Sequence, residues 1–134
     1  LGISTLQELG LTAALGELIS NISGKEETRF DLVAVGLDGR LAEPIEIGLF
    51  RIAQELIANV LRHADATEAS VQVMQEGDEL RLTVEDNGIG GARVLPGGGL
   101  DGIANRVLAV GGTIRLDSPQ SGPTSLEVSV PCAS

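Results

Sequence analysis

Apolar residues recur along this chain at two spacings, one typical of helices and one typical of strands. Apolar residues three or four positions apart predict helices over 11–22, 44–64 and 100–110. Alternating or β-branched runs predict strands over 28–37, 69–75, 79–86, 113–118 and 124–130. Helices and strands in this order predict an α+β fold, a two-layer α/β sandwich in which about three helices cover one face of a mixed, mostly antiparallel sheet.

The size of the chain predicts one domain around one core. It has 134 residues, of which 43% are hydrophobic, and domains of about 100 to 150 residues are the most common. The chain contains no run of about 18 apolar residues that could span a bilayer, and its first residues lack the basic-then-apolar order of a signal peptide. We therefore expect a cytoplasmic domain without direct membrane contact. Its lone cysteine, Cys132, excludes an internal disulfide and a metal site built from several cysteines.

The charge of the chain restricts its partners. The formal net charge is −10, and Lys25 and the eight arginines form no basic run, so we expect no nucleic-acid partner. An acidic domain can still bind an anionic nucleotide through a divalent cation, backbone N–H groups or a helix N-terminus. Half of the 18 glycines lie between Gly88 and Gly112, so we expect exposed backbone to serve a ligand there.

One carboxylate is directed toward the predicted core. In ELRLTVED, alternation places Asp86 on the same face as Leu82 and Val84. Burying a carboxylate is costly unless donors meet it, and an exocyclic amine such as N6 of adenine suits this acceptor. The alternative is a D-N-G hairpin that turns Asp86 outward. However, residues 89–100 contain no alternating run that would form its second strand.

A row of polar residues follows the long predicted helix. Glu55, Asn59 and His63 recur every four residues and therefore lie on one stripe beside the apolar face. Such a stripe can line a cavity at the margin of the core, or it can be the outer edge of an ordinary amphipathic helix. Zinc is a poor candidate here, because it takes three or four protein ligands and the chain has one histidine.

A glycine-rich loop precedes the third predicted helix. Residues 97–102, GGGLDG, match the dinucleotide pattern G-x-G-x-x-G. No strand directly precedes them, and the 17 residues after Asp117 are too few for further βα units. What remains is a loop that leads into a helix N-terminus near Leu100, where free N–H groups can bind phosphate oxygens.

Together these features resemble the Bergerat (GHKL) ATP-binding fold of gyrase, a heat-shock chaperone, histidine kinases and mismatch-repair ATPases. The residues similar to the N box and the two glycine boxes of that family are Glu55-x-x-x-Asn59-x-x-x-His63, Asp86-x-Gly88-x-Gly90 and Gly97-Gly98-Gly99-Leu100. The segments LFRIAQELIANVLRHADA, VEDNGIGG and GGGLDGIANRVLAVGGTIRLDS look similar to the catalytic domain of sensor histidine kinases of the nitrate-sensor and desaturase-regulator type. The resemblance covers residues 5–131.

The resemblance implies a role for each motif. Asp86 would accept a hydrogen bond from adenine N6, Asn59 would coordinate Mg²⁺ on the phosphates, and Glu55 would hold a water. The other implied nucleotide-binding residues are His63, Gly88, Gly90, Gly97, Gly99, Leu100 and Thr124. Three arginines are candidate phosphate partners by charge and neighbourhood, namely Arg62, Arg93 and Arg106.

The resemblance also implies the catalytic domain of a bacterial two-component histidine kinase. It would span 1–134 as a single domain, with 1–10 left from the join to a dimerisation segment. The γ-phosphoryl group of ATP would pass to a histidine on that dimerisation domain, and a response regulator would act downstream. Because His63 would line the nucleotide site, the isolated chain would not autophosphorylate. Two alternatives stay open, a free-standing anti-sigma-factor serine kinase of the same fold and a non-catalytic nucleotide sensor.

Overall fold

In the residues that it describes, the structure, a computed structural model, shows a five-stranded sheet and four helices. It describes residues 3–23, 28–36, 41–61, 66–88, 99–117 and 124–131. The helices are α1 (Ile3–Leu9), α2 (Leu11–Ser23), α3 (Glu43–Asn59) and α4 (Gly99–Ala109). The strands are β1 (Arg29–Val35), β2 (Glu68–Glu76), β3 (Glu79–Asp86), β4 (Thr113–Asp117) and β5 (Thr124–Pro131). The predicted α+β class is confirmed.

The sheet is mixed, and its strand order is β1-β2-β3-β5-β4. β1 and β2 are parallel because α3 returns the chain between them, whereas the other neighbouring strands are antiparallel. β2 and β3 form a hairpin, and Gly77 adopts a φ of 60° in its turn. This topology excludes the doubly wound parallel sheet that a dinucleotide fingerprint at 97–102 would require.

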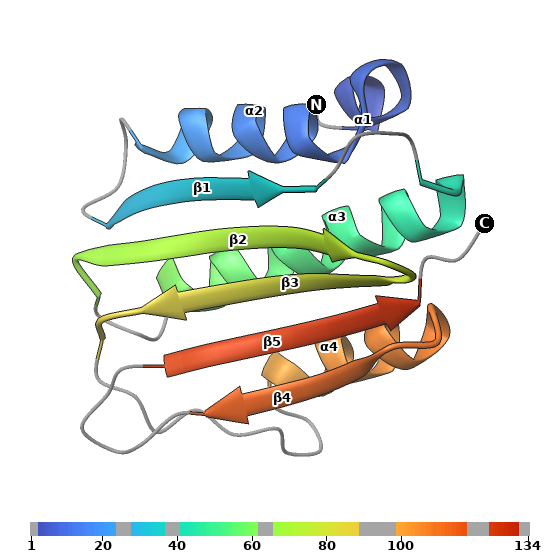
Figure 1. The fold of residues 1–134 in the computed structure, drawn as a ribbon. Coiled ribbons are helices and arrows are strands. Elements are labelled where there is room, and N and C mark those ends of the chain that lie inside the picture. Colours follow the sequence, from blue (N-terminus) through green and yellow to red (C-terminus); the bar gives the residue numbers. More distant parts are fainter. Residues whose placement is uncertain are drawn as a thin grey trace.

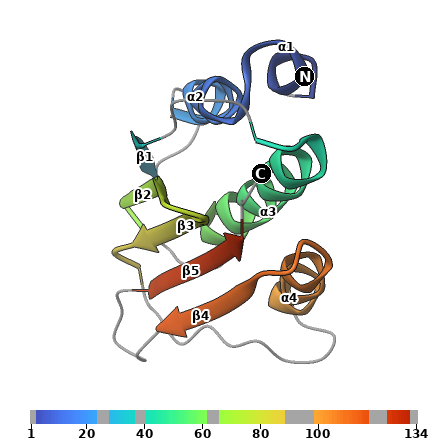
Figure 2. The ribbon, with the colours of Figure 1, turned by 45° about the vertical axis from the view of Figure 1, so that its right-hand side comes forward.

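The described helices lie on one face of the sheet, and none of them covers the opposite face (Figure 1, Figure 2). Every second residue of β3 points toward the helices and is buried, ending with Val84 and Asp86. α3 is the central helix, since it contacts α1, α2, α4 and β3. In the part of the chain that the structure describes, no helix combines the length and the apolar character needed to cross a bilayer.

Two elements differ from the prediction. A separate helix, α1, occupies 3–9, because Gly10 has a φ of 95° and divides what would otherwise be one helix. Leu6 of α1 is buried, so this helix is part of the core. The α-helical part of α3 ends at Asn59, not near Ala64, and residues 60–61 continue as a π-helical turn. The rest of the predicted extension, 62–64, lies outside the described residues.

Candidate functional site

Three elements bring polar residues to one end of the sheet. β3 ends at Asp86, α3 ends at Asn59 and α4 begins at Gly99, and Figure 1 shows these three ends on the same side of the molecule. α3 contacts both α4 and β3. The motifs that are far apart in the sequence therefore surround a common region.

Asp86 is the buried carboxylate of this region. It is 6% exposed and lies on the same face of β3 as Leu82 and Val84, which confirms the inward direction predicted from alternation. Among the described residues, its hydrogen-bond donor is the N–H of Gly88, 2.8 Å from Oδ1. Burial raises the pKa of Asp86, and the Gly88 hydrogen bond lowers it in part. Its second oxygen has the capacity to accept a donor from a ligand.

The D-N-G sequence does not form a hairpin. β3 already has β2 on one side and β5 on the other, so no edge is left for a strand that follows directly after Gly88. Thr124, an implied nucleotide-binding residue, opens β5 and is the Cα partner of Asp86, so the register brings the two residues side by side.

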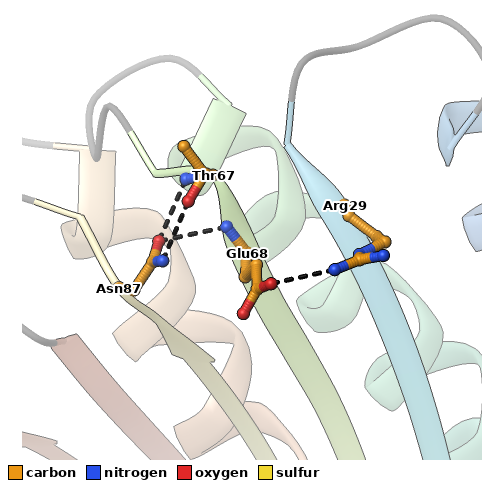
Figure 3. Close-up of polar contacts among 4 residues, drawn as sticks. All are labelled: Arg29, Thr67, Glu68 and Asn87. Carbon is orange, nitrogen blue, oxygen red and sulfur yellow. Dashed lines mark hydrogen bonds and ion pairs between the residues drawn. The ribbon is translucent and has the colours of Figure 1, made fainter.

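Asn87 was not predicted as a site residue, yet it connects two strands at this edge. Figure 3 shows its side chain reaching Thr67 and Glu68 at the start of β2. Oδ1 accepts the N–H of Thr67 at 2.9 Å and that of Glu68 at 3.0 Å, and Nδ2 donates to the Thr67 hydroxyl at 2.9 Å. The signal in the sequence was the asparagine itself, a residue whose side chain readily bonds to backbone.

The polar stripe of α3 lies at the margin of the core. Glu55 and Asn59 are both partly buried, one helical turn apart, beside the buried residues Leu56 and Val60. Asn59 also takes part in a polar or ionic interaction. The prediction that this stripe borders the core, instead of lying opposite to it, is confirmed for these two residues.

Glu55 is paired across the interface between α3 and α4. Its Oε1 lies 2.5 Å from Nε of Arg106, and a Cβ added to Gly102 would lie 3.9 Å from its Oε2. The side chains are 35% and 50% exposed, respectively, so water screens this ion pair and it adds little to stability. Arg106, predicted as a phosphate partner from its charge and neighbourhood, pairs with the Glu55 carboxylate of α3 in this structure.

Two of the predicted site residues lie at the start of α4. Gly99 and Leu100 form the first residues of α4, as the prediction of a helix N-terminus requires. The remaining predicted residues lie outside the described part of the chain, namely His63, Gly90, Gly97, Arg62 and Arg93.

The donor set suits a magnesium ion that is held mainly by a ligand's phosphates. Within the described ranges, no three His, Cys, Asp or Glu side chains gather around a common point. Mg²⁺ commonly takes only one or two protein oxygens and completes its octahedron with phosphate oxygens and water. The amide oxygen of Asn59 would be one such protein oxygen, and Glu55 would be close enough along the same helix to hold a water.

A groove of about 360 Å³ lies elsewhere, at the opposite end of the sheet. Its lining includes the carboxylates of Glu76, Asp78 and Glu79 around the β2–β3 turn. Three carboxylates would repel a triphosphate, so this groove is not the nucleotide site despite its size.

Comparison with known proteins identifies the family. The family described as "Histidine kinase-, DNA gyrase B-, and HSP90-like ATPase" matches residues 45–134. The chain is 32% identical over 135 residues to the signal transduction histidine-protein kinase/phosphatase DegS of Bacillus subtilis, covering 94% of this chain and 35% of DegS. It is 33% identical over 132 residues to the sensor protein VraS of Staphylococcus aureus, covering 94% of this chain and 38% of VraS. The chain thus spans about a third of the length of these relatives.

Solved structures share the fold. The histidine kinase domain of the Erythrobacter litoralis EL346 blue-light activated histidine kinase matches with a TM-score of 0.72 at 24% identity, over 91% of this chain and 61% of that one. The Acinetobacter baumannii histidine kinase AdeS matches with a TM-score of 0.67 at 17% identity, over 99% of this chain and 75% of that one. The chain therefore belongs to the histidine kinase-, DNA gyrase B-, and HSP90-like ATPase family, as an ATP-binding domain of the sensor histidine kinase type.

Proposed function

We propose that this chain is the ATP–Mg²⁺-binding catalytic domain of a bacterial two-component kinase and that it transfers the γ-phosphoryl group of ATP to a histidine on a separate dimerisation domain. The observation that carries the proposal is the buried carboxylate of Asp86, one oxygen of which accepts the N–H of Gly88. A carboxylate accepts from adenine N6, whereas guanine presents an acceptor at the equivalent position. Asp86 thus selects ATP over GTP.

The proposed roles of the other residues follow the layout of the three elements. Asn59 would hold Mg²⁺, which would stabilise the negative charge on the phosphates, and Glu55 would hold a water beside it. The N–H groups at the start of α4 bind phosphate oxygens. The further nucleotide-binding residues in this proposal are His63, Gly88, Gly90, Gly97, Gly99, Leu100 and Thr124.

In phosphoryl transfer the protein contributes chiefly by positioning the reactants and by stabilising the charge of the transition state. The α3 residues supply the negative and polar groups of the phosphate side, and Arg106 on α4 supplies a positive one. Because the Glu55–Arg106 pair is half-exposed, Glu55 can exchange this partner for a water at little cost when nucleotide binds.

The acceptor histidine lies outside this domain in our proposal. His63 belongs to the proposed nucleotide-binding stripe, so it is poorly placed for in-line attack on the γ-phosphate. Residues 1–134 form one catalytic domain, and 1–10, which include α1, form the join to the dimerisation segment. The domain is cytoplasmic, it belongs to the nitrate-sensor and desaturase-regulator type, and a response regulator takes the phosphoryl group next.

Labelled ATP tests this function. The purified chain is incubated with [γ-³²P]ATP and Mg²⁺, alone and together with the dimerisation segment of its parent kinase. We expect no label on the chain alone and acid-labile label on the added segment, because phosphohistidine hydrolyses in acid. Acid-stable label on a serine substrate would favour the anti-sigma-factor kinase. ATP binding without transfer to any acceptor would favour the nucleotide sensor.

A further inference from the structure

Asn87 is exposed, yet its side chain makes three hydrogen bonds. Its Oδ1 accepts two backbone N–H groups, from Thr67 and Glu68, and its Nδ2 donates to the Thr67 hydroxyl (Figure 3). Its own N–H donates to the carbonyl oxygen of Glu68 at 3.1 Å. Both lone pairs of the amide oxygen are therefore used, and the side chain is fixed in one orientation, since backbone N–H groups can only donate.

These bonds begin where the β2–β3 ladder ends. The last residue pair of that ladder is Ala69 and Asp86, and Asn87 adds the next connection beyond it. Strand ends fray unless they are held, because the terminal bonds are the easiest to break. Asn87 thus holds the backbone of β3 at the residue that follows the buried carboxylate.

The segment to which Asn87 binds is itself fixed from the other side. The N–H of Arg29 donates to the carbonyl oxygen of Thr67 at 2.9 Å, and the buried hydroxyl of Thr28 donates to that of Ala66 at 2.7 Å. The guanidinium of Arg29 also pairs with Glu68 at 2.9 Å (Figure 3). Asn87 therefore connects Asp86 to an anchored strand start, and not to a free loop.

We propose that Asn87 is a positioning residue for adenine recognition: its side-chain amide fixes the end of β3 to the start of β2, and thereby fixes the direction in which Asp86 presents its second oxygen. This inference rests on the proposed ATP-binding function. In this role Asn87 acts through its bonds to Thr67 and Glu68, without touching the ligand.

The test compares a nucleotide that has the adenine amine with one that lacks it. ATP and inosine triphosphate differ at this position, where inosine carries a carbonyl oxygen. We expect Asn87→Ala to weaken ATP binding by about tenfold and inosine triphosphate binding by less than about twofold, so that the preference for ATP shrinks. The affinities are measured on the full chain by displacement of a fluorescent ATP analogue, with Mg²⁺ present.

Glu85→Ala is the matched control. Glu85 also joins the same two strands, through a hydrogen bond from Gln72 to its Oε1 at 3.2 Å, but its side chain is exposed on the other face of the sheet. We expect this control to keep both affinities within about twofold of the wild type. Equal losses from Asn87→Ala and Glu85→Ala would overturn the proposal, because strand stability alone would then explain the effect.

Two further variants keep the test decisive if Asn87→Ala does not fold. Thr67→Val removes only the hydroxyl that accepts from Nδ2, and we expect a two- to threefold smaller preference for ATP, roughly the effect of one weak hydrogen bond. Asn87→Asp keeps an oxygen for the two backbone N–H groups and should retain most of the preference. An unchanged preference in Thr67→Val, or equal losses for both nucleotides in Asn87→Ala, would refute the positioning role.

The same measurements separate this proposal from the function on which it rests. A wild-type chain that binds ATP no better than inosine triphosphate would refute the adenine contact of Asp86, and the role of Asn87 with it. A wild-type chain that prefers ATP, combined with an Asn87→Ala variant of undiminished preference, would refute only the role of Asn87.

Discussion

The two sides of the proposed site are built differently. On the adenine side, Asp86 is 6% exposed and lies on a strand that has a neighbour on each side. On the phosphate side, Glu55 lies on a helix surface, is 35% exposed and has a half-exposed arginine, Arg106, as its partner. The first group is held by backbone and burial, and the second by one ion pair that water can replace.

This difference suggests a division of labour. A buried acceptor on a rigid strand discriminates between bases, because a wrong base would leave a buried polar group unpaired. A side chain on a helix surface can change partner as nucleotide and acceptor arrive, since a screened ion pair is weak. Substitutions on the strand side should therefore change affinity and base preference, whereas substitutions between the helices should change turnover.

The largest effect is expected from Asp86→Asn. The carboxylate has two oxygens, one for Gly88 and one for the ligand, whereas an amide has a single oxygen and would leave one donor unmet. We expect ATP affinity to fall on the order of 100-fold. Glu85→Gln makes the same chemical change on the exposed face and should leave affinity unchanged. Equal affinity of wild type and Asp86→Asn, measured by analogue displacement, would remove the adenine assignment.

The second effect concerns magnesium. Asn59→Ala should lower ATP affinity roughly 30-fold in the presence of Mg²⁺ and change it little in EDTA, because the lost amide oxygen is the proposed metal ligand. Arg51→Ala, an exposed change on the same helix, is the control. A loss of equal size with and without Mg²⁺ would show that Asn59 acts on the nucleotide directly.

The third effect is a pH dependence. Burial raises the pKa of Asp86, so this carboxylate should become protonated at a pH nearer to neutrality than an exposed aspartate would. The protonated oxygen no longer accepts a hydrogen bond from adenine, so ATP affinity should fall about tenfold for each pH unit below the raised pKa. Stability should change in the opposite sense: between the ordinary and the raised pKa the folded state binds more protons than the unfolded state, so stability falls as pH rises. Both trends, followed by titration and by thermal unfolding, should disappear in Asp86→Asn.

A smaller effect is expected at the ion pair. Arg106→Ala should leave ATP affinity within about twofold but slow phosphoryl transfer about fivefold, because Glu55 loses the group that holds it in place until the nucleotide-bound water replaces Arg106. The transfer assay with the dimerisation segment measures this. In a Glu55→Gln background, Arg106→Ala should have no additional effect. Independent, multiplicative losses would mean that Arg106 acts on the phosphates and not through Glu55.

The smallest effect on the site is expected from the far end of α4. A Cβ on Gly112 would lie 2.6 Å from the carbonyl oxygen of Ser129, so Gly112→Ala should destabilise the fold by about 1 to 3 kcal/mol. Below its lowered melting temperature, the variant should bind ATP as the wild type does. A large loss of affinity would show that the two ends of the molecule are coupled.

The sequence predicted the sheet and three helices because each repeats one residue pattern over several turns or strand positions. Alternation was sufficient to direct Asp86 inward, since the strand period leaves two possible faces. The sequence pattern was not sufficient to detect the helix α1, which has only seven residues and is separated by Gly10 from the next helix. Helical periodicity is hard to recognise in two turns.

The spacing of residues along the sequence could not predict which side chains pair across the fold. Arg106 and Glu55 are 51 residues apart, and only the packing of α4 on α3 reveals that they meet. Asn87 and Thr67 are 20 residues apart and become neighbours only through the register of β2 and β3. The residue types can be read from the sequence, but whether two residues interact depends on how the fold brings them together.

The division between α1 and α2 has a mechanical consequence. Backbone hydrogen bonds continue on both sides of Gly10. Its N–H donates to the carbonyl oxygen of Leu6, and the N–H of Ala14 donates to that of Gly10, so the junction between the two helices is held by hydrogen bonds. α1 also touches α3 directly. Torque applied to α1 would reach the helix that bears Asn59 without first having to deform the sheet.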